Sequence, residues 1–267
     1  MRGLIKRVVI GAMERLTPHL LAEVRVRIAR AGTEPELGFL PLLADAGGTF
    51  VDVGANNGVY SYTALRSFAR VVAIEAHPDL TAPLRRILGH RGMVLPLALS
   101  DAAGEATLWV PRQGRMDVTT RSSLDQQANP GFPMRPVQVA VATLDALAIE
   151  RPAVLKIDVE GHEFSVLSGA VETLKRYKPV CIVEVEERHN AGGVARAFAF
   201  FARLGYEAWY LHRGRLMPGA GFDVDRLQSR DGAKTFEGAQ SRDYVNNFLF
   251  VHPDNAEGLA RIRTAYR

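Results

Sequence analysis

The stretch Val51–Gly58, "VDVGANNG", decides the fold of this chain. An apolar run passes through one acidic residue, Asp52, into a turn that is bracketed by two glycines and holds two asparagines. Glycines let the backbone approach a ligand closely, and a helix that follows such a turn points free N–H groups at that ligand. In open α/β sheets, ligands lie outside the carboxyl ends of the strands. The turn is therefore predicted to bind a ligand through Gly54, Ala55, Asn56, Asn57 and Gly58.

Beyond this turn, apolar runs rich in β-branched residues alternate with helical stretches. Such alternation builds a mostly parallel sheet with helices on both faces, and near-continuous apolar runs are typical of strands covered on both sides. The predicted fold class is therefore α/β, with a doubly wound, mostly parallel sheet. The predicted strands are "TFVDVG", "RVVAIEA", "MVLPLALS", "PAVLKIDVE", "PVCIVEVEE", "YEAWYLH" and "NNFLFVHP".

The composition is that of a globular protein without a disulfide framework. Of the 267 residues, 47% are hydrophobic and 23% are charged, which is enough apolar material for a full core. The single cysteine, Cys181, cannot form an internal disulfide, and this favours a cytoplasmic location. The formal net charge is +4, but the basic residues are spread along the chain rather than gathered in runs. We therefore expect no nucleic-acid partner.

The N-terminal residues carry an amphipathic helical pattern that leaves two interpretations open. Glu14 and Arg15 interrupt the apolar run, so no signal peptide is expected, and no stretch is long enough to span a bilayer. The pattern fits a helix packed on the domain, or a helix lying on an anionic membrane surface. The apolar positions are Leu4, Ile5, Val8, Val9 and Ala12, with Lys6 and Arg7 between them.

The spacing of the first turn favours one ligand class over another. A dinucleotide site uses G-x-G-x-x-G, whereas this turn reads G-x-x-x-G with Asp52 ahead of it. A carboxylate at that place repels phosphate but attracts the ammonium group of an amino acid, which favours S-adenosylmethionine. Glu75, at the end of the second strand, is predicted to accept hydrogen bonds from ribose hydroxyls, as it would in an NAD(P) site. A purely structural turn stays open as an alternative.

Residues 100–143 break the alternation of strands and helices. Ser100 and Asp101, directly after the third strand, are placed to meet an adenine edge, although Asp101 fits a turn equally well. Two added strands, "GEATLWVP" and "RPVQVAVATL", follow, and the long polar segment that joins them is typical of a lid or a solvated loop. As a lid, the segment offers side chains for hydroxyl or anionic groups: Arg112, Arg115, Arg121, Ser122 and Ser123.

The second informative segment is Leu155–Ala170, "LKIDVEGHEFSVLSGA". Ordinary buried strands do not end in a crowd of charged side chains, and such a cluster in a cleft is a candidate for catalysis. Five ionisable residues gather at the carboxyl end of this predicted strand: Lys156, Asp158, Glu160, His162 and Glu163.

With these motifs the chain resembles the FkbM family of S-adenosylmethionine-dependent methyltransferases, over roughly residues 49–250. The resemblance implies a seven-stranded, Rossmann-like methyltransferase sheet whose last strand is antiparallel, with residues 100–143 inserted between the third and fourth strands. It divides the chain into an N-terminal helical extension (1–45), a methyltransferase domain (46–253) and a C-terminal tail (254–267). The motifs that carry it are "FVDVGANNGVYSY", "VVAIEAHP", "LALSDAAGEATLW", "VATLDAL" and above all "KIDVEGHEFSVLSGA".

The resemblance implies methyl transfer to a hydroxyl group, which requires a general base. His162 titrates nearest neutrality and is the predicted base, with a local role at the helix terminus as the alternative. Asp158 is predicted to orient His162 or to take the proton itself, and a structural ion pair is the alternative. Lys156 pairs with these carboxylates or faces the edge of the core.

Acceptor contacts and a metal are the remaining expectations for this site. The predicted acceptor contacts are Glu160, Glu184, Arg121, Ser122 and Ser123. Glu160 and Glu163 equally fit the N-terminus of the following helix. No metal is predicted, and the alternative is Mg²⁺ held by Asp158 and Glu184, with Glu160 and His162 as further ligands.

The leading prediction is an S-adenosylmethionine-dependent O-methyltransferase whose acceptor is a small molecule or glycan: a sugar, a glycan or another secondary metabolite. An NAD(P)-dependent oxidoreductase would share the sheet and Glu75 but is expected to carry the three-glycine fingerprint. A non-catalytic nucleoside-binding module on the same fold is the other alternative.

Overall fold

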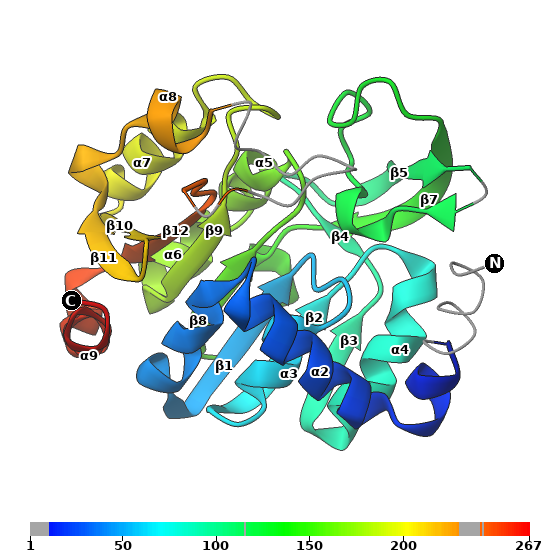
Figure 1. Ribbon diagram of the computed structural model, residues 1–267, viewed down its shortest axis with the longest axis horizontal. Coiled ribbons are helices and arrows are strands. Elements are labelled where there is room, and N and C mark those ends of the chain that lie inside the picture. Colours follow the sequence, from blue (N-terminus) through cyan, green and yellow to red (C-terminus); the bar gives the residue numbers. More distant parts are fainter. Residues whose placement is uncertain (1–10, 115, 230–240, 242) are drawn as a thin grey trace.

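A computed structural model describes residues 11–114, 116–229, 241 and 243–267 (Figure 1). Its main sheet has eight strands in the order β11-β10-β12-β9-β8-β1-β2-β3. The alternation of apolar runs therefore predicts the doubly wound architecture correctly. The strands are β1 (Asp45–Val53), β2 (Phe68–Ile74), β3 (Gly92–Leu95), β8 (Pro152–Ile157), β9 (Val180–Glu184), β10 (Glu207–His212), β11 (Arg215–Pro218) and β12 (Asn247–Val251).

Strand direction in the main sheet agrees with the prediction, but the strand count does not. The five strands from β3 to β9 pair in parallel, and β12 runs antiparallel to both β9 and β10. The eighth strand, β11, corrects the expected seven, because it pairs antiparallel with β10 through a tight hairpin. Arg213 and Gly214 form that turn with φ values of 50° and 76°, and positive φ at both central residues is the geometry that closes two-residue hairpins.

Helices cover both faces of the main sheet, and the side chains of β1 alternate between the two cores. Phe50 points into the core under α2, α3, α4 and α9, whereas Val51 and Val53 point into the core under α5, α6 and α7. The first group comprises α2 (Pro18–Ala31), α3 (Val59–Ala64), α4 (Pro78–Leu88) and α9 (Ala256–Ala265). The second comprises α5 (Glu163–Ser168), α6 (Val171–Tyr177), α7 (Gly193–Arg203) and the short α8 (Val224–Leu227).

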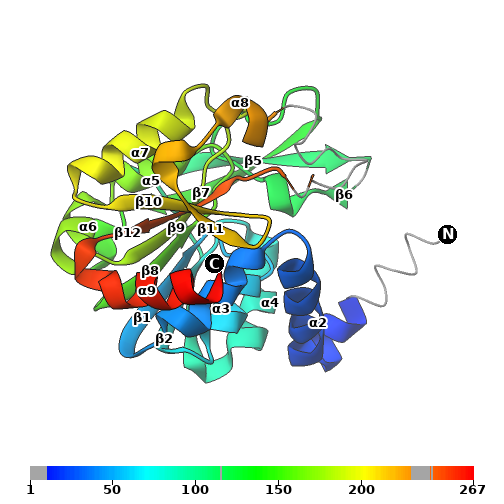
Figure 2. The ribbon, with the colours of Figure 1, turned by 60° about the vertical axis from the view of Figure 1, so that its left-hand side comes forward.

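The described N-terminal segment and the C-terminal helix α9 pack on the same face of the sheet (Figure 2). The 3₁₀ segment η1 (Pro35–Leu43) buries Leu37, Phe39 and Leu40, and the ring of Phe39 meets Tyr266 edge to face at 5.1 Å. The predicted C-terminal tail thus folds as α9. The apolar pattern of residues 1–10 lies outside the described residues, and within the described ones no helix is long and apolar enough to cross a bilayer.

The segment predicted as an insertion forms a second, four-stranded sheet in the order β4-β7-β5-β6, at the upper right of Figure 1. As predicted, it contributes two long strands, β5 and β7, which pair antiparallel. The expected third strand is divided between the two sheets, because its second half, β4, pairs with β7. The bounds are β4 (Ala98–Leu99), β5 (Gly104–Gln113), β6 (Met116–Asp117) and β7 (Met134–Ala142). The remaining 3₁₀ turns are η2 (Gly89–Arg91), η3 (Thr119–Arg121), η4 (Asp145–Leu147), η5 (Gly219–Gly221) and η7 (Pro253–Asn255).

Glu36, in η1, gives the fold a dependence on pH. Its side chain is buried, and Oε2 has no hydrogen-bond partner among the described residues. Burial, with a contribution from the nearby Glu34, raises the pKa of Glu36 to about 8. Above the unfolded-state pKa the unfolded chain releases this proton while the folded chain keeps it, so stability falls by up to about 1.4 kcal/mol per pH unit until the folded pKa is reached.

We therefore expect Glu36→Gln to gain stability over the wild type as pH rises from about 5 to about 8, because glutamine has no proton to lose. Urea unfolding at both pH values measures the difference, and groups common to both proteins cancel in it. Glu257→Gln, at a position whose side chain is 97% exposed, is the control and should show a constant difference. A constant difference for Glu36→Gln as well would contradict the prediction.

Candidate functional site

The two glycines of the turn after β1 are explained by the close packing of neighbouring segments against this turn. Gly54 and Gly58 have φ values of 78° and 77°, which favour glycine. A Cβ at Gly54 would lie 1.8 Å from the carbonyl oxygen of Asp158, and one at Gly58 would lie 2.6 Å from Ile87 Cδ1. The expected reason for these glycines was approach to a ligand. The structure shows that Gly54 allows β1 and β8 to end side by side, and that Gly58 allows the turn to pack against α4.

Asp52 is held from one side by the helix that follows. Its Oδ2 accepts hydrogen bonds from the Ser61 N–H at 2.9 Å and the Ser61 hydroxyl at 2.6 Å. Burial raises the pKa of Asp52 to about 6, so the carboxylate is mostly ionised at neutral pH. An oriented, ionised carboxylate beside the turn can attract a cationic group.

Glu75 joins the turns that follow β1 and β2. Its two carboxylate oxygens accept hydrogen bonds from the backbone N–H groups of Asn56 and His77, at 2.6 and 2.7 Å. Burial raises the pKa of Glu75 to about 7. The side chain lines a pocket, here the Glu75 pocket, whose apolar walls come from the end of β2, β4 and the small sheet. Those walls include Ala76, Leu97, Ala98, Leu99, Leu108 and Leu124.

A second pocket adjoins the first and has many charged side chains in its lining. This Lys156 pocket contains Asp52, Lys156 and Glu184, together with Ala29 and Glu34 from the N-terminal segment. The two pockets share Gly54, Asn56, Thr120, Asp158 and Glu160. The carboxyl ends of β1 and β8 therefore form a common rim between an apolar pocket and a polar one.

Lys156 is buried at the base of this polar pocket, with 1% of its surface exposed. Its ammonium group lies 3.7 Å from Asp158 Oδ2, donates to the Ile157 carbonyl at 3.3 Å and stands 5.1 Å from the centre of the Tyr60 ring. Burial would lower the pKa of Lys156, but Asp158 and Glu184 raise it above its ordinary value. The lysine is therefore a fixed positive charge among carboxylates.

Three carboxylates of this pocket lie close enough to hold a cation. Oxygens of Asp158, Glu160 and Glu184 all lie within 4.8 Å of one another, and hard divalent cations prefer such ligands. Burial and the neighbouring Asp158 raise the pKa of Glu184 well above its ordinary value, and its Oε1 accepts a hydrogen bond from Asn246. His162, expected as a further ligand, is not part of this group. The ammonium group of Lys156 already supplies one positive charge to this group of three carboxylates.

Sequence reasoning missed the residues that support Glu160 from the loop after β9. His189 Nε2 lies 3.1 Å from Glu160 Oε2 in ion-pair contact, and Arg188 Nη2 lies 3.8 Å from the same oxygen. Arg188 also binds Glu186 through both nitrogens of its guanidinium edge. The signal was the run "EVEERH", which places charged residues at the carboxyl end of the strand next to β8. Glu160 itself adopts φ 51°, a strained conformation of the kind that gathers at functional sites.

His162 lies at the start of α5 and lines the Glu75 pocket. Its Nε2 is 2.9 Å from the Ser100 hydroxyl, which in turn lies 3.1 Å from Asp101 Oδ1. Burial lowers the pKa of His162, so the imidazole is neutral near pH 7. The side chain makes no capping hydrogen bond to α5, and its ring partner is Ser100 rather than Asp158. Glu163 instead serves the helix start, accepting from the Gly161 N–H at 2.8 Å.

Residues of the predicted lid line both pockets, but some predicted site residues lie elsewhere than expected. Ser122 and Ser123 line the Glu75 pocket, and Arg121 lines the Lys156 pocket. The Ser122 hydroxyl is buried and has no partner among the described residues. Where Ser100 and Asp101 were expected against an adenine edge, the residues just before them line the pocket instead. Arg112 pairs with Asp117 at 3.4 Å, outside both pockets, and Arg115 lies outside the described residues.

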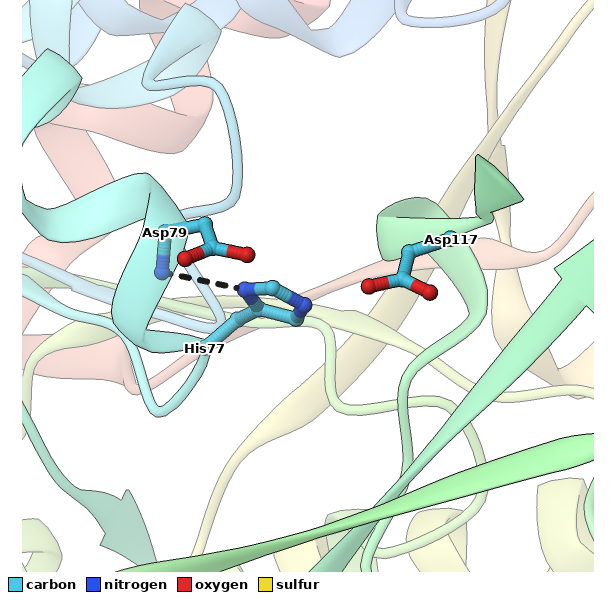
Figure 3. A group of neighbouring side chains, drawn as sticks. All are labelled: His77, Asp79 and Asp117. Atoms are coloured by element: carbon cyan, nitrogen blue, oxygen red, sulfur yellow. Dashed lines mark hydrogen bonds between the residues drawn. The ribbon is translucent and has the colours of Figure 1, made fainter. Parts of the chain in front are cut away.

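A second group of potential metal ligands lies apart from these pockets, at the start of α4. His77, Asp79 and Asp117 bring ligand atoms together there (Figure 3). The Arg135 guanidinium stands among them, 2.6 Å from Asp117 Oδ2, 3.4 Å from His77 Nε2 and 3.8 Å from Asp79 Oδ2. Arg135 already pairs with both carboxylates of this cluster, so we assign no metal to it.

A doubly wound sheet with an antiparallel strand between β9 and β10, and with adjoining pockets at its carboxyl edge, defines the Rossmann-like methyltransferase class. A protein-family model described as "Methyltransferase FkbM domain" matches residues 52–208 of this chain. The chain belongs to the FkbM methyltransferase family.

One protein of similar sequence and two solved structures of similar fold are methyltransferases. The hexuronic acid methyltransferase AglP of Haloferax volcanii is 28% identical over 212 residues, covering 77% of this chain and 83% of that protein. The structure of an FkbM methyltransferase from Methylobacillus flagellatus KT has a TM-score of 0.50 at 14% identity, covering 78% of this chain but only 44% of that one. An O-methyltransferase from Bacillus cereus, solved in complex with SAH, has a TM-score of 0.45 at 13% identity.

Proposed function

We propose that this protein is an S-adenosylmethionine-dependent O-methyltransferase that acts on a hydroxyl group of a sugar or glycan. The observation that carries the proposal is the shared rim: an apolar pocket with a carboxylate at its back meets a charged pocket along Gly54, Asn56, Asp158 and Glu160. Group transfer needs a donor site and an acceptor site that meet at one place, and this rim supplies it.

The donor side fits S-adenosylmethionine in three respects. Glu75 offers oxygens for the ribose hydroxyls, and the orphaned Ser122 hydroxyl gains a partner when polar atoms enter the same pocket. Asp52, ionised at neutral pH, lies in the adjoining Lys156 pocket close to the shared residue Gly54, where it attracts the ammonium group of a methionyl end that extends across the rim. When bound, this cofactor supplies a methyl group already activated for displacement by its sulfonium charge.

The acceptor side fits a polyhydroxylated molecule. Asp158, Glu160, Glu184 and Glu186 present carboxyl oxygens to the Lys156 pocket, and such oxygens accept hydrogen bonds from sugar hydroxyls. The similarity to a hexuronic acid methyltransferase supports a sugar acceptor.

In this proposal His162 removes the proton of the acceptor hydroxyl. Its lowered pKa keeps the imidazole neutral and able to accept a proton near pH 7, and Ser100 fixes the orientation of the ring. Asp158, on the shared rim, aligns the hydroxyl, and Lys156 keeps Asp158 in place from below. Arg121 at the end of η3, and Ser122 and Ser123 directly after it, line the pair of pockets from the predicted lid.

Ligand binding separates this proposal from an oxidoreductase. S-adenosylhomocysteine at about 100 times its dissociation constant should stabilise the protein by about 2.7 kcal/mol, and NADH should leave the unfolding midpoint unchanged. Stabilisation by NADH alone would reject the proposal. Mass spectrometry of candidate glycans incubated with enzyme and cofactor then identifies the acceptor by the added methyl mass.

The ribose assignment of Glu75 gives a quantitative prediction. Glu75→Ala should weaken S-adenosylhomocysteine binding by about 1.5–3 kcal/mol, the range for a hydrogen bond to a charged group. Glu75→Gln keeps the shape and should lose less. Isothermal titration calorimetry measures both, with Asp79→Ala as the control because that exposed carboxylate lines neither pocket. Unchanged affinity in Glu75→Ala would remove the ribose assignment.

A further inference from the structure

The outer face of α2 carries a stripe of exposed apolar side chains. Leu20, Val24 and Ile28 expose 57%, 41% and 69% of their surfaces, and Leu16, just before the helix, exposes 81%. Because residues four apart advance by about 40° around a helix, the three residues within α2 cover about 80° of one face. Leu21 and Ala22 are the buried residues of α2, and Figure 2 shows this helix at the edge of the molecule. A continuous exposed apolar stripe on a helix marks a surface that contacts a membrane or a partner molecule.

Basic groups border this stripe. Arg27, whose side chain is 79% exposed, stands between Val24 and Ile28 along the helix, and Arg66 approaches from the end of α3. Both arginines lie near the single carboxylate of this edge, Glu23, at 3.8 and 2.6 Å, which leaves a net positive border.

The same helix leads to the acceptor side of the candidate site. Ala29, near the end of α2, and Thr33 and Glu34, directly after it, line the Lys156 pocket. Ala29 follows Ile28, the last residue of the stripe, so the end of the stripe and this part of the pocket lie on the same turn of the helix.

We propose that α2 binds an anionic lipid surface, with the stripe among the acyl chains and the basic border at the headgroups. Apolar residues on one face and cations beside them are the pattern of an interfacial helix, and the cations select anionic lipid over neutral lipid. Binding in this orientation brings the Lys156 pocket to the lipid surface, where a lipid-anchored acceptor would be within reach. That last consequence rests on the proposed function, whereas the binding itself does not.

Vesicle sedimentation tests the proposal without cofactor or acceptor, so its outcome is independent of the enzymatic assignment. The full chain is mixed with vesicles of phosphatidylcholine alone, or with about one third phosphatidylglycerol added. We expect the protein to sediment with the anionic vesicles only, and added salt to weaken the binding. The double variant Leu20→Asp/Ile28→Asp should lose binding at least about tenfold, because charged side chains replace the inserted ones.

The control is Met93→Asp, which places one of these two negative charges at a residue that is 57% exposed on β3 and should bind like the wild type. An unchanged thermal unfolding midpoint confirms that the double variant is folded. Wild-type vesicle binding by the double variant would overturn the proposal. So would a dimer in sedimentation velocity that the double substitution dissociates, combined with no vesicle binding, since the stripe would then be covered by a second copy.

Discussion

Lys156→Met is expected to cost about 3 kcal/mol of folding stability, because it removes the positive charge buried among Asp52, Asp158 and Glu184. Methionine fills a similar volume, so the loss reports the charge rather than a cavity. The carboxylates left behind then lack their counterion in a poorly hydrated place. Protonation relieves this, and since the pKa of Asp52 is about 6, the cost should be larger near pH 8 than near pH 5.

Urea unfolding of Lys156→Met at the two pH values measures this effect. Lys175→Met serves as the control, because its ammonium pairs with Glu172 at 3.0 Å on the surface, with both side chains more than half exposed. Removing such a pair should change stability by less than about 1 kcal/mol. If both variants lost the same small amount, Lys156 would not be the counterion of the cluster.

The sequence predicts the architecture of the main sheet because its buried strands are written as apolar runs. The runs around Val51, Val72, Leu155 and Ile182 all become central parallel strands, as expected for strands covered on both faces. The third run, "MVLPLALS", misled because Pro96 cannot donate to a sheet ladder. Its two halves, β3 and β4, therefore pair in different sheets.

The eighth strand was missed for a different reason. β11 is only four residues long, has no buried residue and ends at Pro218, so the sequence contains no apolar run that would predict this strand. It exists because the turn at Arg213 and Gly214 folds it back onto β10. Edge strands of this kind depend on their turn and their neighbour more than on their own composition.

The residues of the candidate site also differ in whether the sequence alone could predict them. Asp52, Glu75, Lys156 and Asp158 were predictable because each lies in or directly after a strand, and parallel strands end at one edge. Side chains that arrive by tertiary contact were not predictable, such as His189 against Glu160, from a loop beyond the next strand. The partner of His162 was missed because Ser100 follows β4, whose place in the small sheet the sequence did not reveal.

His162→Ala is expected to lower kcat by about 10²–10⁴-fold, the usual contribution of a general base, and to leave S-adenosylhomocysteine affinity nearly unchanged. Because burial lowers the pKa of His162, the acidic limb of the wild-type pH–rate profile should fall below pH 6.5. That limb should vanish in His162→Ala. A loss of rate without a change in the limb would assign the histidine a structural role.

Two further variants separate the base from its neighbours. Ser100→Ala removes the hydroxyl that lies 2.9 Å from the ring, and should reduce kcat less than His162→Ala while keeping the limb. His212→Ala, a substitution on β10 where the ring contacts Asp243 instead, should leave kcat unchanged. Asp158→Asn keeps the shape of the rim but removes its charge beside Lys156. If Asp158→Asn abolished both turnover and the acidic limb while His162→Ala retained them, Asp158 would be the base, because only the residue that takes the proton sets that limb.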